Sequence, residues 1–165
     1  MDFVIRPTAE GDIPAKGRVH SLCWRETYRG LIPDGYLESI TPEFCTGLAR
    51  SRNIDTLVAL CVGEMAGFVC FCAEARPFTA LEGCSEVAAL YVLRKYQSLG
   101  LGRALMESAL GRLPHGRVIL YVLDGNRRAI EFYRHMGFEL TGRELREEIP
   151  GGELRELEMM KKRGG

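Results

Sequence analysis

The apolar and polar positions along the chain predict strands in its middle and in its second half. Two apolar runs, Thr56–Val62 and Met65–Ala73, are rich in valine, cysteine and phenylalanine, and Gly63–Glu64 between them is expected to form the two-residue turn of a hairpin. The run Glu86–Leu93 is apolar on both faces, as is typical of a central strand. Arg117–Leu123 predicts another buried strand.

Helical periodicity predicts one helix before this last strand and one after it. The helix before it ends at Pro114 and Gly116 and carries a wide apolar stripe. The stripe consists of Leu101, Leu105, Met106, Ala109, Leu110 and Leu113. The helix after it ends at Gly137, which suits a left-handed C-terminal cap. Its shared face carries Ala129, Phe132, Tyr133 and Met136.

The remaining segments complete the order of elements. Phe3–Pro7 is expected to form a short strand, a helix then reaches Tyr28, and Thr41 is expected to cap a second helix. Phe138–Ile149 and Glu153–Lys162 alternate around a Pro-Gly-Gly turn and predict two antiparallel strands. The order is one strand, two helices, three strands, a helix, a strand, a helix and two strands. Because no repeat or linker interrupts it, we expect residues 1–165 to form a single α/β domain of the α+β type.

The charge balance and the cysteines narrow the class of protein. Lys plus Arg and Asp plus Glu number 22 each, so no net field favours nucleic acid or a membrane surface. Residues 1–12 lack the pattern of a signal peptide, and no segment approaches the roughly 20 apolar residues of a membrane helix. The six cysteines form no CxxC pair, so no metal site is expected. We interpret them as reduced apolar residues of a cytoplasmic protein.

A glycine-containing loop is the best candidate for a ligand site. Gly100 and Gly102 lie between a predicted strand and a predicted helix. Main-chain N–H groups at a helix start have no partner within the helix, so they favour a phosphate. The nucleoside-triphosphate motif is excluded because no lysine follows a suitable glycine. A dinucleotide site is disfavoured because Leu105 occupies the third glycine position, although Asp124 stands near the spacing of a ribose-binding acid.

Residues on both sides of this loop resemble one family. Glu86–Met106 is similar to the acetyl-CoA signature of the GCN5-related N-acetyltransferase (GNAT) superfamily, whose core Gln/Arg-x-x-Gly-x-Gly/Ala is matched by Gln97–Gly102. Leu120–Glu139 resembles the second cofactor segment of the family, which is a strand, an asparagine and a helix that bears Phe-Tyr and ends in Gly-Phe. The resemblance implies a twisted, mixed, mostly antiparallel sheet flanked by helices, with a V-shaped split between strands 4 and 5.

The resemblance also implies an activity and a set of cofactor contacts. The activity is transfer of acetyl from acetyl-CoA to a primary amine by direct attack in a ternary complex. Loop N–H groups would hold the pyrophosphate, and the strand edge would bind the pantetheine arm, with the Val92 N–H polarising the thioester carbonyl. The predicted cofactor-binding residues are Leu90, Tyr91, Val92, Gln97, Ser98, Leu99, Gly100, Leu101, Gly102, Arg103, Asn126, Ala129 and Tyr133.

Two residues are candidates for acid–base chemistry. Coenzyme A leaves as a thiolate, whose thiol has a pKa of about 8.5, and Tyr133 is predicted to protonate it. An alkylammonium has a pKa of about 10.4, so the attacking amine needs a base near neutral pH. Glu86 opens the strand before the loop, where the family often keeps a carboxylate, and is the predicted base. A water relay is the alternative.

The acceptor stays open at this stage. Trp24 and Tyr28 share one helical face and are predicted to bind it. Small-molecule amines and protein or peptide amines both fit, whereas nucleic acid and membrane partners are not expected. Family members commonly form dimers, so a homodimer is an open alternative. The alternative function is a non-catalytic module of the same fold that senses acyl-CoA.

Overall fold

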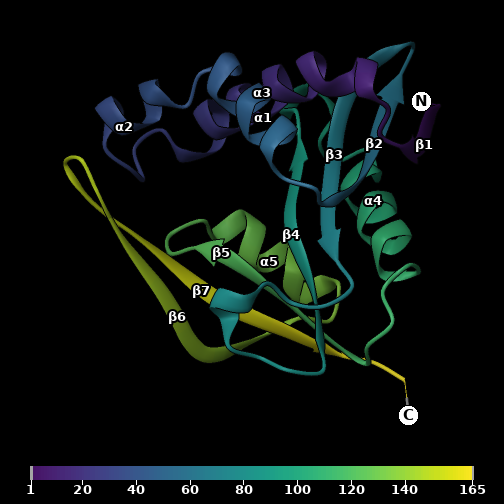
Figure 1. Cartoon of the computed structure of the whole chain (residues 1–165), viewed down its shortest axis with the longest axis vertical. Coiled ribbons are helices and arrows are strands. Elements are labelled where there is room, and N and C mark those ends of the chain that lie inside the picture. The colour runs from purple at the N-terminus through teal and green to yellow at the C-terminus, as the bar shows by residue number, and fades with distance from the viewer. Residues whose placement is uncertain (1, 165) are drawn as a thin grey trace.

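The computed structural model describes residues 2–164 and contains a seven-stranded sheet in the order β1-β2-β3-β4-β5-β7-β6 (Figure 1). Its strands are β1 (Phe3–Pro7), β2 (Asp55–Cys61), β3 (Glu64–Cys72), β4 (Cys84–Val92), β5 (Arg117–Leu123), β6 (Glu139–Ile149) and β7 (Gly152–Lys162). The α-helices are α1 (Ile13–Tyr28), α2 (Asp34–Ser39), α3 (Pro42–Ser51), α4 (Leu101–Leu110) and α5 (Arg127–His135). None of the helices within residues 2–164 is long and apolar enough to cross a membrane.

Strands β4 and β5 are the only parallel neighbours in this part of the chain, and they separate after a short pairing. Cys84, Ser85 and Glu86 pair with residues 117–119. Beyond Glu86 the two strands diverge, as Figure 1 shows. All other neighbouring strands are antiparallel. The predicted mixed, mostly antiparallel sheet with a V-shaped split between strands 4 and 5 is therefore confirmed.

Helices α1 and α4 cover opposite faces of the strands before the split. Phe68 and Val69 are neighbours on β3, so their side chains point to opposite faces. Phe68 packs with Val19 of α1, while Val69 packs with Leu105 and Met106 of α4. Both helices are held by buried apolar surface, and each presents one end to the split.

Two details of the predicted secondary structure are wrong. The hairpin turn between β2 and β3 is Val62–Gly63 rather than Gly63–Glu64, because Glu64 already pairs with Cys61 in the ladder. Both turn residues have positive φ, 52° and 77°. A short helix, α2, also forms between the helix that reaches Tyr28 and the helix that Thr41 caps, where none is predicted. Six residues are too few for a helical period to be visible in the sequence.

The predicted caps are confirmed. Thr41 begins α3, and its hydroxyl oxygen accepts a hydrogen bond of 3.1 Å from the main-chain N–H of Phe44. Gly137 follows α5 with a φ of 95°, the left-handed conformation that glycine adopts without a steric penalty.

The C-terminal end of α4 is fixed by a residue far along the chain. Arg163 donates from Nη1 to the carbonyl of Leu110 at 2.5 Å and from Nη2 to the carbonyl of Leu113 at 2.6 Å. Carbonyls at a helix end have no partner within the helix, and the negative end of the helix dipole favours a cation. This contact holds α4 in place, so that its N-terminus lies firmly at the split.

Candidate active site

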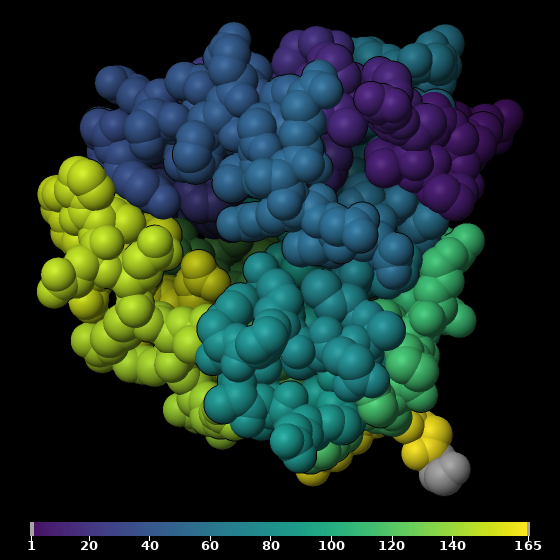
Figure 2. Space-filling model, in the orientation of Figure 1, coloured from purple at the N-terminus to yellow at the C-terminus, as the bar shows by residue number. Residues whose placement is uncertain are grey.

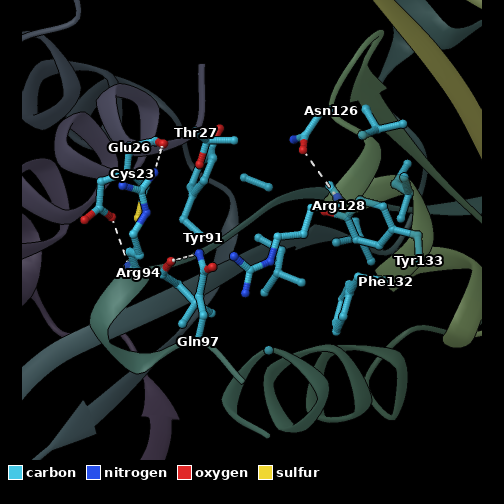
Figure 3. A pocket seen from close by; sticks show the side chains of 18 of the residues that line it. Cys23, Glu26, Thr27, Tyr91, Arg94, Gln97, Asn126, Arg128, Phe132 and Tyr133 are labelled. Atoms are coloured by element: carbon cyan, nitrogen blue, oxygen red, sulfur yellow. Dashed lines mark hydrogen bonds between the residues drawn. The ribbon is translucent and has the colours of Figure 1, made fainter. Parts of the chain in front are cut away.

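A cleft of about 520 Å³ lies where β4 and β5 diverge (Figure 3). One wall is β4 from Val87 to Val92, and the opposite wall is formed by residues 120–122 of β5 and by α5. The loop before α4 and the C-terminal part of α1 also line it. The cleft therefore brings together segments that the sequence keeps up to 110 residues apart, such as Cys23 and Tyr133.

The edge of β4 that faces the cleft carries a main-chain donor. The Leu93 N–H donates to the carbonyl of Ala66 on the β3 side at 2.9 Å. Because main-chain groups alternate between the two edges of a strand, the Val92 N–H points to the other edge, into the cleft. The carbonyl of Val92 accepts a hydrogen bond of 2.9 Å from Gln97 Nε2. Gln97 therefore ties the glycine loop to the strand edge.

The glycine loop presents main-chain N–H groups to the same cleft. Ser98 and Gly100 have φ values of 64° and 84°, so the loop turns sharply just before α4 begins. The N–H of Ala104 is bonded to the carbonyl of Gly100 at 3.0 Å. The N–H groups of Leu101 and Gly102, which come earlier in the helix, have no carbonyl to meet. An anion in the cleft would be stabilised by them and by the helix dipole.

Three arginines line the cleft near this loop, and they differ in how they are held. Arg94 donates to the main-chain carbonyl of Glu26, and Arg103 pairs with Glu107 at 2.9 Å. Arg128 of α5 donates only to the hydroxyl of Ser98, at 3.4 Å, and has no acidic partner within residues 2–164.

Sequence reasoning missed Arg128. Its position two residues after Asn126 gives no signal until the fold brings α5 opposite the glycine loop (Figure 3). Its guanidinium is exposed at the cleft and free of carboxylates, so it adds positive charge where the loop already favours an anion.

Asn126 and Ala129 meet at the start of α5. The side-chain oxygen of Asn126 accepts a hydrogen bond of 3.3 Å from the Ala129 N–H, which makes Asn126 the cap of the helix. Both residues line the cleft. The cap leaves the side-chain NH₂ of Asn126 without a partner in the described residues 2–164, so it is available to a ligand.

Tyr133 lines the cleft on the α5 side. Its ring packs edge-on against Phe132 and Phe138, with centroid distances of 5.4 and 6.1 Å. Burial raises the pKa of the Tyr133 hydroxyl to about 12. The hydroxyl therefore stays protonated near neutral pH and can donate a hydrogen bond into the cleft.

Glu86 lies outside the cleft. Its side chain is fully buried, and both carboxylate oxygens are bound by Arg76, with Nε at 3.0 Å from Oε1 and Nη2 at 2.6 Å from Oε2. The main-chain N–H of Arg76 also donates to Oε1 at 3.0 Å. The structure thus does not bring this carboxylate to the other predicted site residues, and its role as a base stays a prediction.

Of the two predicted acceptor residues, only Tyr28 lines the cleft. Trp24 packs perpendicular to it at a centroid distance of 4.9 Å and donates its indole N–H to the Tyr91 hydroxyl at 2.9 Å. The side chain of Tyr91 therefore contacts α1. The ring of His20 stacks on Tyr91 at 4.9 Å, and burial lowers the pKa of His20 to about 4. This aromatic group joins α1 to β4.

The family model and the curated relatives that match this chain are those of acetyltransferases. Residues 16–138 match the model of the Acetyltransferase (GNAT) family. "Probable N-acetyltransferase Rv2775" of Mycobacterium tuberculosis is 26% identical over 145 residues, which are 84% of this chain and 81% of that protein. "Uncharacterized N-acetyltransferase YuaI" of Bacillus subtilis is 28% identical over 155 residues, 87% of this chain and 88% of that protein.

Solved structures show the same fold. The PaiA N-acetyltransferase of Thermoplasma acidophilum, determined in complex with coenzyme A, superposes with a TM-score of 0.73 at 23% identity. The superposition covers 99% of this chain and 100% of that one.

Proposed function

The chain belongs to the acetyltransferase (GNAT) family, and from this premise we propose that it transfers the acetyl group of acetyl-CoA to a primary amine by direct attack in a ternary complex. The protein is an acetyl-CoA-dependent acyltransferase, and acetyl-CoA is its co-substrate. One observation carries the proposal. A free strand edge, a helix N-terminus and the neutral Tyr133 hydroxyl all line one cleft that is open to an acceptor.

The described residues fit the parts of coenzyme A. Its pyrophosphate suits the N–H groups of the loop before α4 and the unpaired guanidinium of Arg128. Its amide-containing pantetheine arm suits the open edge of β4 at Leu90–Val92, where it would add to the sheet as a peptide strand does. The side-chain NH₂ of Asn126 and the small side chain of Ala129 border the same path.

In the reaction, the amine nitrogen attacks the thioester carbon, a C–N bond forms and the C–S bond breaks. The Val92 N–H, which points into the cleft, would stabilise the negative charge that develops on the carbonyl oxygen. Sulfur leaves as a thiolate, and Tyr133 would donate a hydrogen bond to it. Because a thiol has a pKa of about 8.5, far below that of Tyr133, complete proton transfer from Tyr133 alone is uphill. After the C–N bond has formed, the nitrogen of the attacking neutral amine loses one proton, and this proton completes the balance on sulfur.

The acceptor amine, which is an alkylammonium near neutral pH, must lose a further proton before it attacks. Glu86 is the proposed acceptor of this proton, and its pairing with Arg76 means that a water must connect it to the cleft. If Glu86 has this role, replacing it with glutamine lowers kcat most at low pH, where few amine molecules are neutral.

The test is release of free thiol from acetyl-CoA in the presence of a panel of amines. The panel contains monoamines, diamines, amino acids and peptides with free N-termini, and thiol is measured with a chromogenic disulfide. We expect thiol release that depends on the amine, begins without a lag and saturates as the concentration of either substrate is raised. If acetyl-CoA raises the melting temperature but no amine is acetylated, the proposal is wrong and the acyl-CoA-sensing module is the better account.

A further inference from the structure

Glu156 lies on the face of β7 that turns toward the helices α1 and α2. Side chains alternate along a strand, so Leu154, Glu156 and Glu158 share one face. Leu154 is buried in a cluster against which Trp24 and Tyr28 pack. The carboxyl group of Glu156 therefore points toward the aromatic residues that the sequence associates with the acceptor.

Two other carboxylates on this side of the sheet, Glu158 and Glu86, are already satisfied. Glu158 is 1% exposed and accepts a hydrogen bond of 2.9 Å from the Tyr121 hydroxyl. Glu86 is held by Arg76. Glu156, by contrast, has no ion pair and no side-chain hydrogen bond to any residue between 2 and 164.

This carboxylate is partly desolvated. Burial raises the pKa of Glu156, the nearby negative charges of Glu147 and Glu86 act in the same direction, and Arg76 opposes them. A charged group that has lost water and gained no partner is stabilised by any counter-ion that reaches it. The position is therefore suited to a cation that is not part of the chain.

Glu156 is partly exposed, and the surface is hollowed beside β7. Figure 2 shows a hollow between the helical layer, the loop that joins β3 to β4 and the β6–β7 hairpin, with atoms of β7 at its bottom. Tyr28 lines the cleft and also packs on the apolar cluster that contains Leu154 of β7. Tyr28 therefore contacts both the cleft and the residues beside the face of β7 that carries Glu156.

We propose that Glu156 binds a second positive charge of the acceptor, so that the preferred substrates are small diamines or polyamines rather than monoamines or amino acids. This inference rests on the proposed acetyl transfer to an amine. The alkyl chain between the two nitrogens would lie along Tyr28 and Tyr36, which pack on the same apolar cluster as Leu154. Aromatic faces favour both alkyl groups and cations.

Chemistry favours the non-reacting nitrogen as the partner of Glu156. The attacking amine must be neutral, and a carboxylate held beside it would keep it protonated and slow the attack. A nitrogen at the far end of the acceptor keeps its charge throughout the reaction. Glu156 can bind that charge in both the ground state and the transition state, so it would act mainly on KM.

The experiment compares 1,4-diaminobutane, n-butylamine and 4-aminobutanoate as acceptors for the wild type and for Glu156→Gln. A charged hydrogen-bonded contact corresponds to about 10- to 100-fold in kcat/KM. We expect the wild type to prefer the diamine over the monoamine by this factor, with 4-aminobutanoate the poorest. Glu156→Gln should remove the preference by raising KM for the diamine and leave kcat/KM for n-butylamine unchanged. Glu156→Lys should make 4-aminobutanoate better than the diamine.

Glu153→Gln is the matched control, because Glu153 is an exposed carboxylate of β7 that pairs with Arg146 at 3.2 Å. It should keep the preference of the wild type. Equal use of the diamine and the monoamine by the wild type, or a diamine preference that survives Glu156→Gln, overturns the inference while acetyl transfer stands. If no amine is acetylated although acetyl-CoA raises the melting temperature, the proposed function fails first.

Discussion

The two sides of the cleft differ in the kind of chemical group that is available to a ligand. On the proposed coenzyme side, the groups available to the ligand are mostly main-chain: the edge of β4, the loop with Ser98 and Gly100 in left-handed conformations, and the first N–H groups of α4. On the proposed acceptor side they are side chains, namely Tyr28 in the cleft, with Tyr36 and Glu156 beyond it. These come from α1, α2 and β7, which are far apart in the sequence.

This difference determines how substitution should act. Most substitutions leave the main-chain N–H and C=O groups in place. Binding on the coenzyme side therefore depends on the few positions that determine the backbone conformation. Side chains are lost one at a time, so the acceptor side can change its specificity without disturbing the coenzyme side. A substitution on one side should therefore change KM for the substrate of that side alone. Only Tyr133, beside the thioester, belongs to both sides.

Tyr133→Phe should give the largest effect. It removes the hydroxyl that we propose donates to the departing sulfur, and it keeps the ring between Phe132 and Phe138. General acid catalysis contributes about 100-fold or more, and we expect kcat to fall by about 100-fold with both KM values unchanged. Thiol release under saturating substrates measures it.

Tyr96→Phe is the control for this prediction, because the Tyr96 hydroxyl is bound to Glu64 outside the cleft. It should leave kcat unaltered. If Tyr133→Phe retains full kcat, Tyr133 is a packing residue and its hydroxyl does not stabilise the departing sulfur.

Gly100→Val should affect the coenzyme side alone. A β-branched residue at a φ of 84° is strained by about 1–2 kcal/mol, and the loop would relieve the strain by turning its N–H groups away from the pyrophosphate. We expect KM for acetyl-CoA to rise by about 30-fold, as the loss of charged hydrogen bonds implies, while KM for the amine stays the same. Gly63→Val places the same strain in the β2–β3 turn, at a φ of 77°, and should lower stability only. An equal rise in both KM values would contradict the separation of the two sides.

The same contrast explains what the sequence could predict. The coenzyme side follows local rules, so the strand, the two glycines, the Asn126 cap and the helix that bears Tyr133 could all be found from a short segment. The acceptor side depends on register between distant strands. Glu156 is one of several carboxylates in an alternating acidic segment, and only the pairing of β7 with β5 and β6 sets it apart.

Glu86 shows what spacing in the sequence does not reveal. Its position at the start of the cofactor strand matched an expected catalytic carboxylate, but Arg76, from a loop without regular pattern, takes both of its oxygens. An ion pair between a strand and a loop cannot be predicted from spacing, because neither element fixes the path of the other.

Trp24→Phe should give the smallest effect and should fall on the acceptor side. It removes the hydrogen bond from the indole N–H to the Tyr91 hydroxyl, which fixes α1 against β4, and a buried hydrogen bond contributes about 1 kcal/mol to the free energy of unfolding. Since Trp24 supports Tyr28 and does not line the cleft, KM for the amine should rise by only about 2- to 3-fold, and KM for acetyl-CoA should not change.

Tyr91→Phe removes the same hydrogen bond from the other side. Urea unfolding of both single variants and of the double variant should show that the second substitution costs almost nothing once the first is made; a full sum of the two losses would mean that Trp24 and Tyr91 act independently and that α1 is positioned by packing alone.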